Sequence, residues 1–256
     1  MSRWYDAIPG VTGKMPLSDA TLSAWPDRAM EGRLHHLSFC PVALTEVYAV
    51  AQQIALTIID SPAGPELVAD LRADRLLRPA FAADGKWVLA YRPNVLRMLP
   101  FFVENDGSIW RIDDANGEPS PDRPLDLQKR LCSILGAQVS GRLKLRESLT
   151  YLIENEFLEP VENPADPAIP EWQVVSRAMS GSRICEDFLA MRLLHAMVFS
   201  TQHLKTRAPL QDQTVIARLS LARDDLMRKR PFLMESDTID FDKLLGERPA
   251  TGGPVT

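Results

Sequence analysis

The clearest alternation of large and small side chains lies just after the turn signal Asp84-Gly85. Trp87, Leu89 and Tyr91 occupy every second position, which would place them on one face of an extended chain. Glycine accepts the positive φ of a tight turn, so Asp84-Gly85 is typical of a hairpin. The pattern therefore predicts a strand immediately after this turn.

A second hairpin is predicted a few residues later. Apolar runs at 101–103 and 108–112 flank Asn105-Asp106-Gly107, another turn that ends in glycine. Between the hairpins, prolines bracket a short helix over 94–99. The aromatic side chains of this region favour a packed sheet face, and the alternative is an aromatic platform for a ligand. These side chains are Trp87, Tyr91, Phe101 and Trp110.

The beginning of the chain differs because prolines and glycines interrupt it and it shows little periodicity. We predict an irregular arm over 1–34 that lies across the body of the protein or across a partner. Trp4, Tyr5 and Trp25 are large aromatic residues that would be unusual in water, so we expect them to be docked.

Short elements are predicted between this arm and the hairpins. An extended stretch at 35–42 would point the adjacent side chains of His35 and His36 to opposite faces. The remaining elements, in chain order, are a helical stretch over 45–53, a short β-branched strand over 55–59 and a helical turn over 67–71.

A polar, proline-rich run at 114–124 separates a strand-rich first half, 35–113, from a helical second half, 125–207. We therefore predict an α+β fold in which the helices pack against the strands. The elements expected in the second half are a helix over 125–135 that Gly136, Ser140 and Gly141 interrupt, a helix ending near 157, a strand over 171–176 and a long helix over 183–207.

Beyond residue 207 we predict a helical extension over 208–245 and a tail over 246–256. Within the extension, residues 210–230 read as an amphipathic helix whose apolar face carries Val215, Leu219, Ala222 and Leu226. The tail is rich in glycine, proline and threonine, and in isolation we expect it to be mobile.

Composition narrows the class of protein. The chain has 256 residues, 45% of them hydrophobic and 25% charged, which is ordinary for a globular protein. A net charge of −5 argues against a nucleic-acid partner, because there is no excess of lysine and arginine to neutralise phosphates. No apolar run is long enough for a transmembrane helix, and the beginning of the chain lacks a secretory pattern, so we expect a cytoplasmic protein.

Residue types that carry chemistry are present without a recognisable arrangement. The cysteines are odd in number and widely spaced, which favours small buried side chains over disulfides. His195 and His203 lie about two turns apart on the predicted helix, too far to share one metal ion. The sequence contains neither a nucleophile elbow nor a phosphate loop. We therefore predict no catalytic residue, metal or cofactor. The cysteines mentioned above are Cys40, Cys132 and Cys185.

Several motifs resemble those of the SapC-like family, which takes its name from an association with surface-layer proteins. The resemblance covers 35–207 and begins with Phe39-Cys-Pro-Val-Ala-Leu-Thr45, followed by a run from Ala49 to Ile58 in which Ala55-Leu56 replaces the more usual Tyr-Pro. It continues through Gly85-Lys-Trp87, Tyr91-Arg-Pro93, Leu99-Pro-Phe101, 113–119 and the Glu-x-Phe-Leu-Glu-Pro ending at Pro160. None of these motifs is catalytic; the resemblance implies an accessory role, and no active site can be carried over from it.

Two functional hypotheses follow. The first is a non-catalytic accessory or assembly protein that binds a protein partner, which could be a second copy, another protein or the periphery of a membrane complex. The second is an enzyme or ligand-binding protein with a pocket that joins His35 or His36 to Arg92 or Arg97 and takes a small anionic substrate. The candidate interaction or ligand surface comprises Trp4, Tyr5, Trp25, His35, His36, Trp87, Tyr91, Arg92 and Trp110.

Overall fold

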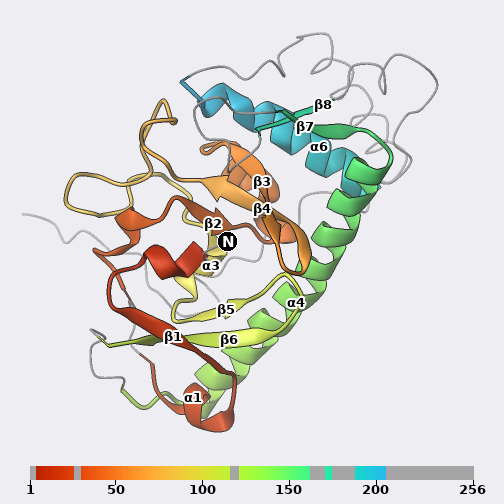
Figure 1. Cartoon of the computed structure of the whole chain (residues 1–256). Coiled ribbons are helices and arrows are strands. Elements are labelled where there is room, and N and C mark those ends of the chain that lie inside the picture. Colours follow the sequence, from red (N-terminus) through yellow and green to blue (C-terminus); the bar gives the residue numbers. More distant parts are fainter. Residues whose placement is uncertain (1–3, 26–29, 116–120, 162–170, 175–187, 206–256) are drawn as a thin grey trace, which may run out of the picture.

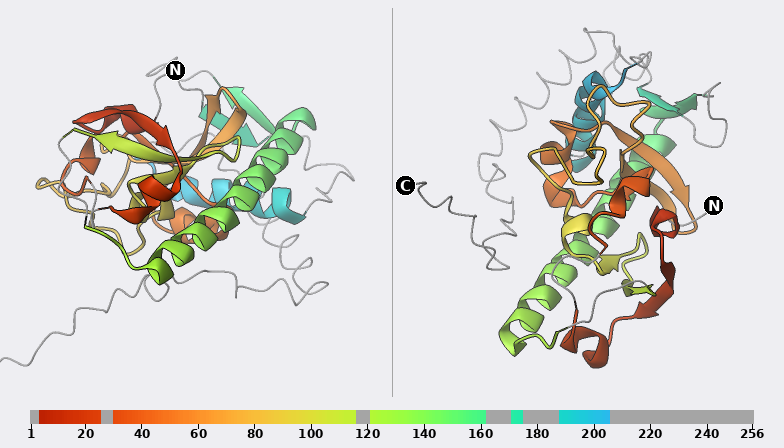
Figure 2. Two further views of the ribbon diagram at one scale, coloured as in Figure 1. Left: turned by 90° about the horizontal axis from the view of Figure 1, so that it is seen from below. Right: turned by 90° about the vertical axis from the view of Figure 1, so that its left-hand side faces the viewer.

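The computed structural model of the chain describes residues 4–25, 30–115, 121–161, 171–174 and 188–205 (Figure 1). It confirms the predicted α+β class: antiparallel sheets occupy mainly the first half, and the long helix α4 (Leu125–Glu154) belongs to the second. The views in Figure 2 show α4 running along one side of the strands. This helix contacts elements from both halves of the described chain.

The first sheet has the order β1-β6-β5. Its hairpin, β5 (Phe101–Val103) and β6 (Ile109–Asp114), confirms the second predicted turn, where Gly107 has a φ of 88°. The predicted irregular arm is wrong, because β1 (Val11–Pro16) pairs with β6, and α1 (Asp19–Ser23) follows it. β1 lies at the edge of the sheet, and most of its side chains are half-exposed. Its sequence therefore lacks the alternation of apolar and polar residues that predicts a strand.

The second sheet has the order β2-β4-β3. β3 (Leu56–Ser61) confirms the predicted buried strand, and β2 (Phe39–Pro41) lies within the predicted extended entry. The predicted helical turn near residue 67 is wrong, since β4 (Gly64–Asp70) occupies that position between the other two strands. Its last residues are buried without alternation, and such a short apolar run does not distinguish strand from helix.

Short helical elements connect the two ends of β2 to the rest of the molecule. η2 (Leu34–His36) precedes β2, and η3 (Leu44–Glu46) with α2 (Val47–Ala51) follows it. The second pair confirms the helical stretch predicted from Thr45. η2 contradicts the extended geometry predicted for His35 and His36, because it is a 3-10 turn.

The Asp84-Gly85 turn is confirmed, but the strand predicted after it is not formed. Gly85 has a φ of 79°, and Trp87 pairs with Phe81 only through an isolated bridge. The chain then continues irregularly to α3 (Asn94–Arg97). The backbone N–H of Tyr91 donates to the Gln53 side chain (3.0 Å) rather than to a neighbouring strand, so a side-chain contact holds this part of the segment.

In the second half, the helix interruption predicted at Gly136–Gly141 is wrong, because α4 is continuous. Buried leucines on both sides of these small residues hold the helix, including Leu135 and Leu145. The elements that follow are β7 (Leu158–Val161), β8 (Glu171–Val174), α6 (Phe188–Ser200) and η4 (Thr201–His203). Residues 183–187 of the predicted long helix, the extension 208–245 and the tail 246–256 lie outside the described residues.

The buried apolar residues form two clusters. The larger lies under both three-stranded sheets and α6, and the smaller joins Trp25, Met98 and Phe101 to the first part of α4. Trp87, Tyr91 and Trp110 pack against the larger cluster, so the four aromatic residues predicted to share one sheet face do not share it. None of the described helices is long and apolar enough to cross a membrane.

Candidate functional site

Four of the predicted surface aromatics are parts of the packed structure. Trp4 stands edge-on to Tyr5 at 5.5 Å between ring centroids, and Tyr5 is 1% exposed. Trp25 packs edge-on against Phe101 at 5.6 Å. Trp110 lies beneath the Lys14 ammonium, 3.7 Å from the ring centroid. Trp4, Tyr5 and Trp25 therefore dock as predicted, and Trp110 packs against the larger cluster.

The other five predicted residues belong to two segments that lie against each other. The His35 ring faces the 84–85 turn so closely that a Cβ on Gly85 would lie 2.7 Å from His35 Nδ1. Arg92 Nη1 lies 3.7 Å from Glu31 Oε1. The His35 and His36 rings are on the same side of η2, with centroids 4.1 Å apart, instead of on opposite faces. These contacts gather His35, His36, Trp87, Tyr91 and Arg92 near one turn.

Beside this turn, the chain exposes apolar side chains on a loop that backbone hydrogen bonds and packed aromatic rings hold in place. Leu77 is 61% exposed and Val88 is 53% exposed. The Val88 N–H donates to Ala80 O at 3.0 Å, and Phe81 and Trp87 pack edge-on beneath with centroids 5.2 Å apart. We name this the 77–90 surface; its exposed apolar members are Leu77, Pro79, Ala82, Ala83, Val88 and Ala90.

A buried carboxyl that sequence reasoning missed as a functional feature lies at Glu46, which is 1% exposed. It accepts hydrogen bonds from the backbone N–H groups of Ala43 (2.7 Å) and Asn94 (2.6 Å) and from the Tyr91 hydroxyl (3.1 Å). Burial raises the pKa of Glu46 to about 7, and these donors oppose the rise. The only sequence signal was a Glu at the start of a predicted helix.

A buried ion pair lies nearby between α4 and β4. Arg142 Nη1 lies 2.8 Å from Glu66 Oε1, and both side chains are at least nine-tenths buried. Burial raises the pKa of Glu66, and the charge of Arg142 opposes that change. Burial also raises the pKa of the Cys40 thiol well above its usual range, helped by the charge of Glu46. Cys40 is therefore a buried thiol, as predicted, whereas Cys132 is exposed on α4 and the prediction of a buried side chain is wrong there; Cys185 lies outside the described residues.

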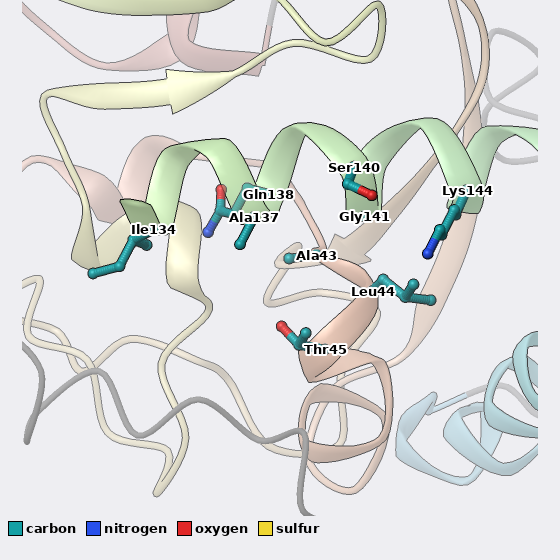
Figure 3. A pocket seen from close by; sticks show the side chains of 9 residues that line it. All are labelled: Ala43, Leu44, Thr45, Ile134, Ala137, Gln138, Ser140, Gly141 and Lys144. Carbon is teal, nitrogen blue, oxygen red and sulfur yellow. The ribbon is translucent and has the colours of Figure 1, made fainter. Parts of the chain in front are cut away.

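A small groove opens between the middle of α4 and the turn that contains η3 (Figure 3). Its volume of about 170 Å³ lies below the 300–1,000 Å³ typical of small-molecule pockets. We name it the α4–η3 groove; it is lined by Ala43, Leu44, Thr45, Ile134, Ala137, Gln138, Ser140, Gly141 and Lys144.

The residues of the predicted anion pocket do not line this groove. Arg92 instead donates from Nη2 to Leu96 O at 3.2 Å and faces Glu31. Within the described ranges, no cluster of histidine, cysteine, aspartate and glutamate side chains could hold a metal ion.

Comparison of the chain with known proteins finds no matching family model, no matching curated protein and no matching solved structure. The SapC-like resemblance accordingly stays a prediction from the quoted motifs.

Replacing Gly85 with alanine is expected to lower the free energy of unfolding by about 1–3 kcal/mol. The added Cβ would lie 2.7 Å from His35 Nδ1 and 2.8 Å from Gly32 O, at a φ of 79°. Gly136→Ala is the matched control, because a Cβ there meets nothing within 4 Å. In helix α4 that control is expected to stabilise by about 0.5–1 kcal/mol. Urea denaturation measures both, and equal stabilities would contradict the tight contact at Gly85.

Proposed function

We propose that this protein is a non-catalytic accessory protein that binds a protein partner through the 77–90 surface. The observation that carries the proposal is the exposure of Leu77 and Val88 on one loop. Single exposed apolar residues are ordinary. The described part of the chain has three exposed large apolar side chains. Two of them, Leu77 and Val88, lie within this loop, and the third is Leu125.

The backbone of the loop supports this proposal because it is held in place before any partner arrives. Leu77 N–H donates to His203 O at 2.8 Å, and Ala82 N–H donates to Lys86 O at 2.9 Å. A pre-organised loop loses less conformational entropy on binding than a free one. Exposed charges border the apolar residues, among them the Lys86–Asp84 pair at 2.9 Å, which resembles the polar rim of an interface.

The buried ionisable groups support the non-catalytic part of the proposal. Glu46 accepts hydrogen bonds from two backbone N–H groups and a tyrosine hydroxyl inside the protein. Glu66 is engaged by Arg142. Neither carboxyl lines the α4–η3 groove, so neither group is in contact with that opening. The SapC-like motifs, which imply an accessory role, point in the same direction.

The test is a photo-crosslinking amino acid placed at Val88 in the full chain inside cells, followed by reconstitution with the protein it captures. Leu77→Glu combined with Val88→Glu is expected to weaken that complex by about tenfold or more, because two apolar contacts are lost. Leu125→Glu is the control, since Leu125 is 71% exposed at the beginning of α4. Equal affinity of the double variant and the control variant would overturn the proposal.

A further inference from the structure

The α4–η3 groove contains a buried amide whose hydrogen-bonding groups are only partly used. Gln138 is 7% exposed, and its side chain lines the groove (Figure 3). Its Nε2 donates to the thioether of Met98 at 3.2 Å, and a thioether is a weak acceptor. Among the described residues, the Gln138 side chain makes no other hydrogen bond. Since a primary amide has two N–H donors and a carbonyl acceptor, one donor and the acceptor remain for a ligand.

These two remaining groups match the chemistry of a peptide group. A peptide group offers one C=O acceptor and one N–H donor, so it can satisfy both groups of Gln138 together. An anion would use only the donor, and a cation would use only the acceptor. Apolar walls from Leu44, Ile134 and Ala137 lie beside the amide, so an apolar side chain is expected to accompany the peptide group. The volume of about 170 Å³ accommodates one leucine-sized side chain, since a cavity of about 150 Å³ accommodates benzene.

A cation marks the opposite end of the groove. Figure 3 shows Lys144 at the end remote from Ile134, with its nitrogen on the side of Leu44. Lys144 is exposed and makes no ion pair with the other described residues. It follows Gln138 by six residues, or about 9 Å along α4. An extended peptide rises about 3.3 Å per residue, so a carboxylate about three residues from the peptide group bound to Gln138 would lie beside Lys144.

The dimensions of the groove favour an extended chain over a helix. A Cβ on Gly141 would lie 3.3 Å from Leu44 Cβ, so α4 and the η3 turn come close together. A helix with its side chains is about 10–12 Å across, which this spacing does not admit. Ala137 and Ser140 are small and exposed, so an extended chain can approach the backbone of α4. We propose that the α4–η3 groove binds an extended acidic segment of a partner protein, with a peptide group on Gln138, an apolar side chain against Ala137 and a carboxylate beside Lys144.

This peptide site is separate from the 77–90 surface, with which it shares no residue, and it does not rest on the proposed function. Leu77→Glu combined with Val88→Glu is expected to leave peptide binding in the groove unchanged. Failure of the peptide to bind would likewise leave partner binding at Leu77 and Val88 untouched, so the two proposals fail or succeed in different measurements.

The test titrates the full chain with the peptide acetyl-Glu-Ala-Ala-Leu-Ala-Ala-Glu-amide by isothermal titration calorimetry at low ionic strength. Its glutamates lie three residues to either side of the leucine, so a carboxylate reaches Lys144 in either chain direction. The expected Kd is on the order of 0.1–1 mM, because few groups make contact. Replacing both glutamates of the peptide with glutamine is expected to weaken binding about two- to fivefold, the contribution of one exposed ion pair.

Variants of the protein separate the three contacts. Ala137→Leu fills the groove and is expected to weaken binding about tenfold or more, whereas Ser133→Leu, exposed one turn earlier and outside the groove, is the matched control. Lys144→Glu is expected to weaken binding about fivefold or more and Lys144→Arg to preserve it, with Lys129→Glu as the control. Gln138→Met, of similar shape, is expected to weaken binding about tenfold because it removes the amide.

The exposed positions of Ala137 and Lys144 keep the test decisive even where Gln138→Met fails to fold. Equal affinity of the parent chain and Ala137→Leu would overturn the proposal, as would the absence of binding at about 5 mM peptide. Equal affinity of the glutamate and glutamine peptides would show that no carboxylate is recognised. Tighter binding of acetyl-Ala-Ala-Leu-Ala-Ala-Ala with a free carboxyl end would assign the groove to chain termini and overturn the acidic segment.

Discussion

Replacing Glu46 with alanine is expected to lower the free energy of unfolding at pH 5 by about 3 kcal/mol, because buried donors lose their acceptor. The carboxyl accepts from the N–H groups of Ala43 and Asn94, which belong to segments far apart in sequence. Its removal therefore leaves buried backbone donors without a partner and separates η3 from α3. Urea denaturation measures the loss, and Thr45→Ala, at an exposed neighbouring position, is the control.

The contribution of Glu46 is expected to depend on pH, with stability decreasing as pH rises. Its pKa is raised by burial from 4.5 to about 7, so the folded protein holds a proton that the unfolded chain releases. The stabilisation is complete below pH 4.5 and decreases by roughly 3 kcal/mol as pH rises through 7. Glu46→Gln cannot ionise and should lack this dependence. Parallel stability curves for the wild type and Glu46→Gln would contradict the raised pKa.

Replacing Arg142 with leucine is expected to destabilise the protein by about 3–5 kcal/mol, because Glu66 would remain as an uncompensated buried charge. The side chains of Arg142 and Glu66 are 3% and 10% exposed, so water cannot replace the lost partner. Among the described residues, the Nε atom of Arg142 has no hydrogen-bond partner, which weakens the pair compared with a fully satisfied one.

The double variant, Arg142→Leu with Glu66→Leu, is expected to recover most of that loss, since well-packed apolar residues often replace a buried ion pair without penalty. A double-mutant cycle measured by urea denaturation gives the coupling between the two positions. A double variant as unstable as the sum of the single variants would show that the two side chains do not depend on each other.

Local signals in the sequence identified the turns and several elements correctly. Gly85 and Gly107 mark their turns because the positive φ is a property of the residue itself. The pairing expected after Gly85 stops at the single bridge between Trp87 and Phe81, because the Tyr91 N–H donates to the Gln53 side chain instead of to a strand. β1 was not predicted for a related reason: the strand that it pairs with among those described, β6, lies about a hundred residues later in the chain.

The candidate sites were less predictable than the fold because they depend on long-range burial. The proximity of Glu46 to Asn94, and of Arg142 to Glu66, arises only after the sheets and α4 have packed together. The periodicity of α4 indicated which leucines are buried, but not that Gly141 faces Leu44 across a groove. Aromatic residues such as Tyr5 and Trp25 were correctly expected to be docked, since their size alone favours burial.

The position of α4 has a consequence for the cooperativity of unfolding. Leu135 belongs to the smaller apolar cluster and Leu149 to the larger, so one continuous helix contributes to both. In a protein, most of the stability of a helix comes from the packing of its apolar face. Loss of either cluster removes support from the helix and thereby from the other cluster. The described elements should therefore melt in a single transition, with amide protons on both parts of α4 exchanging through the same global opening.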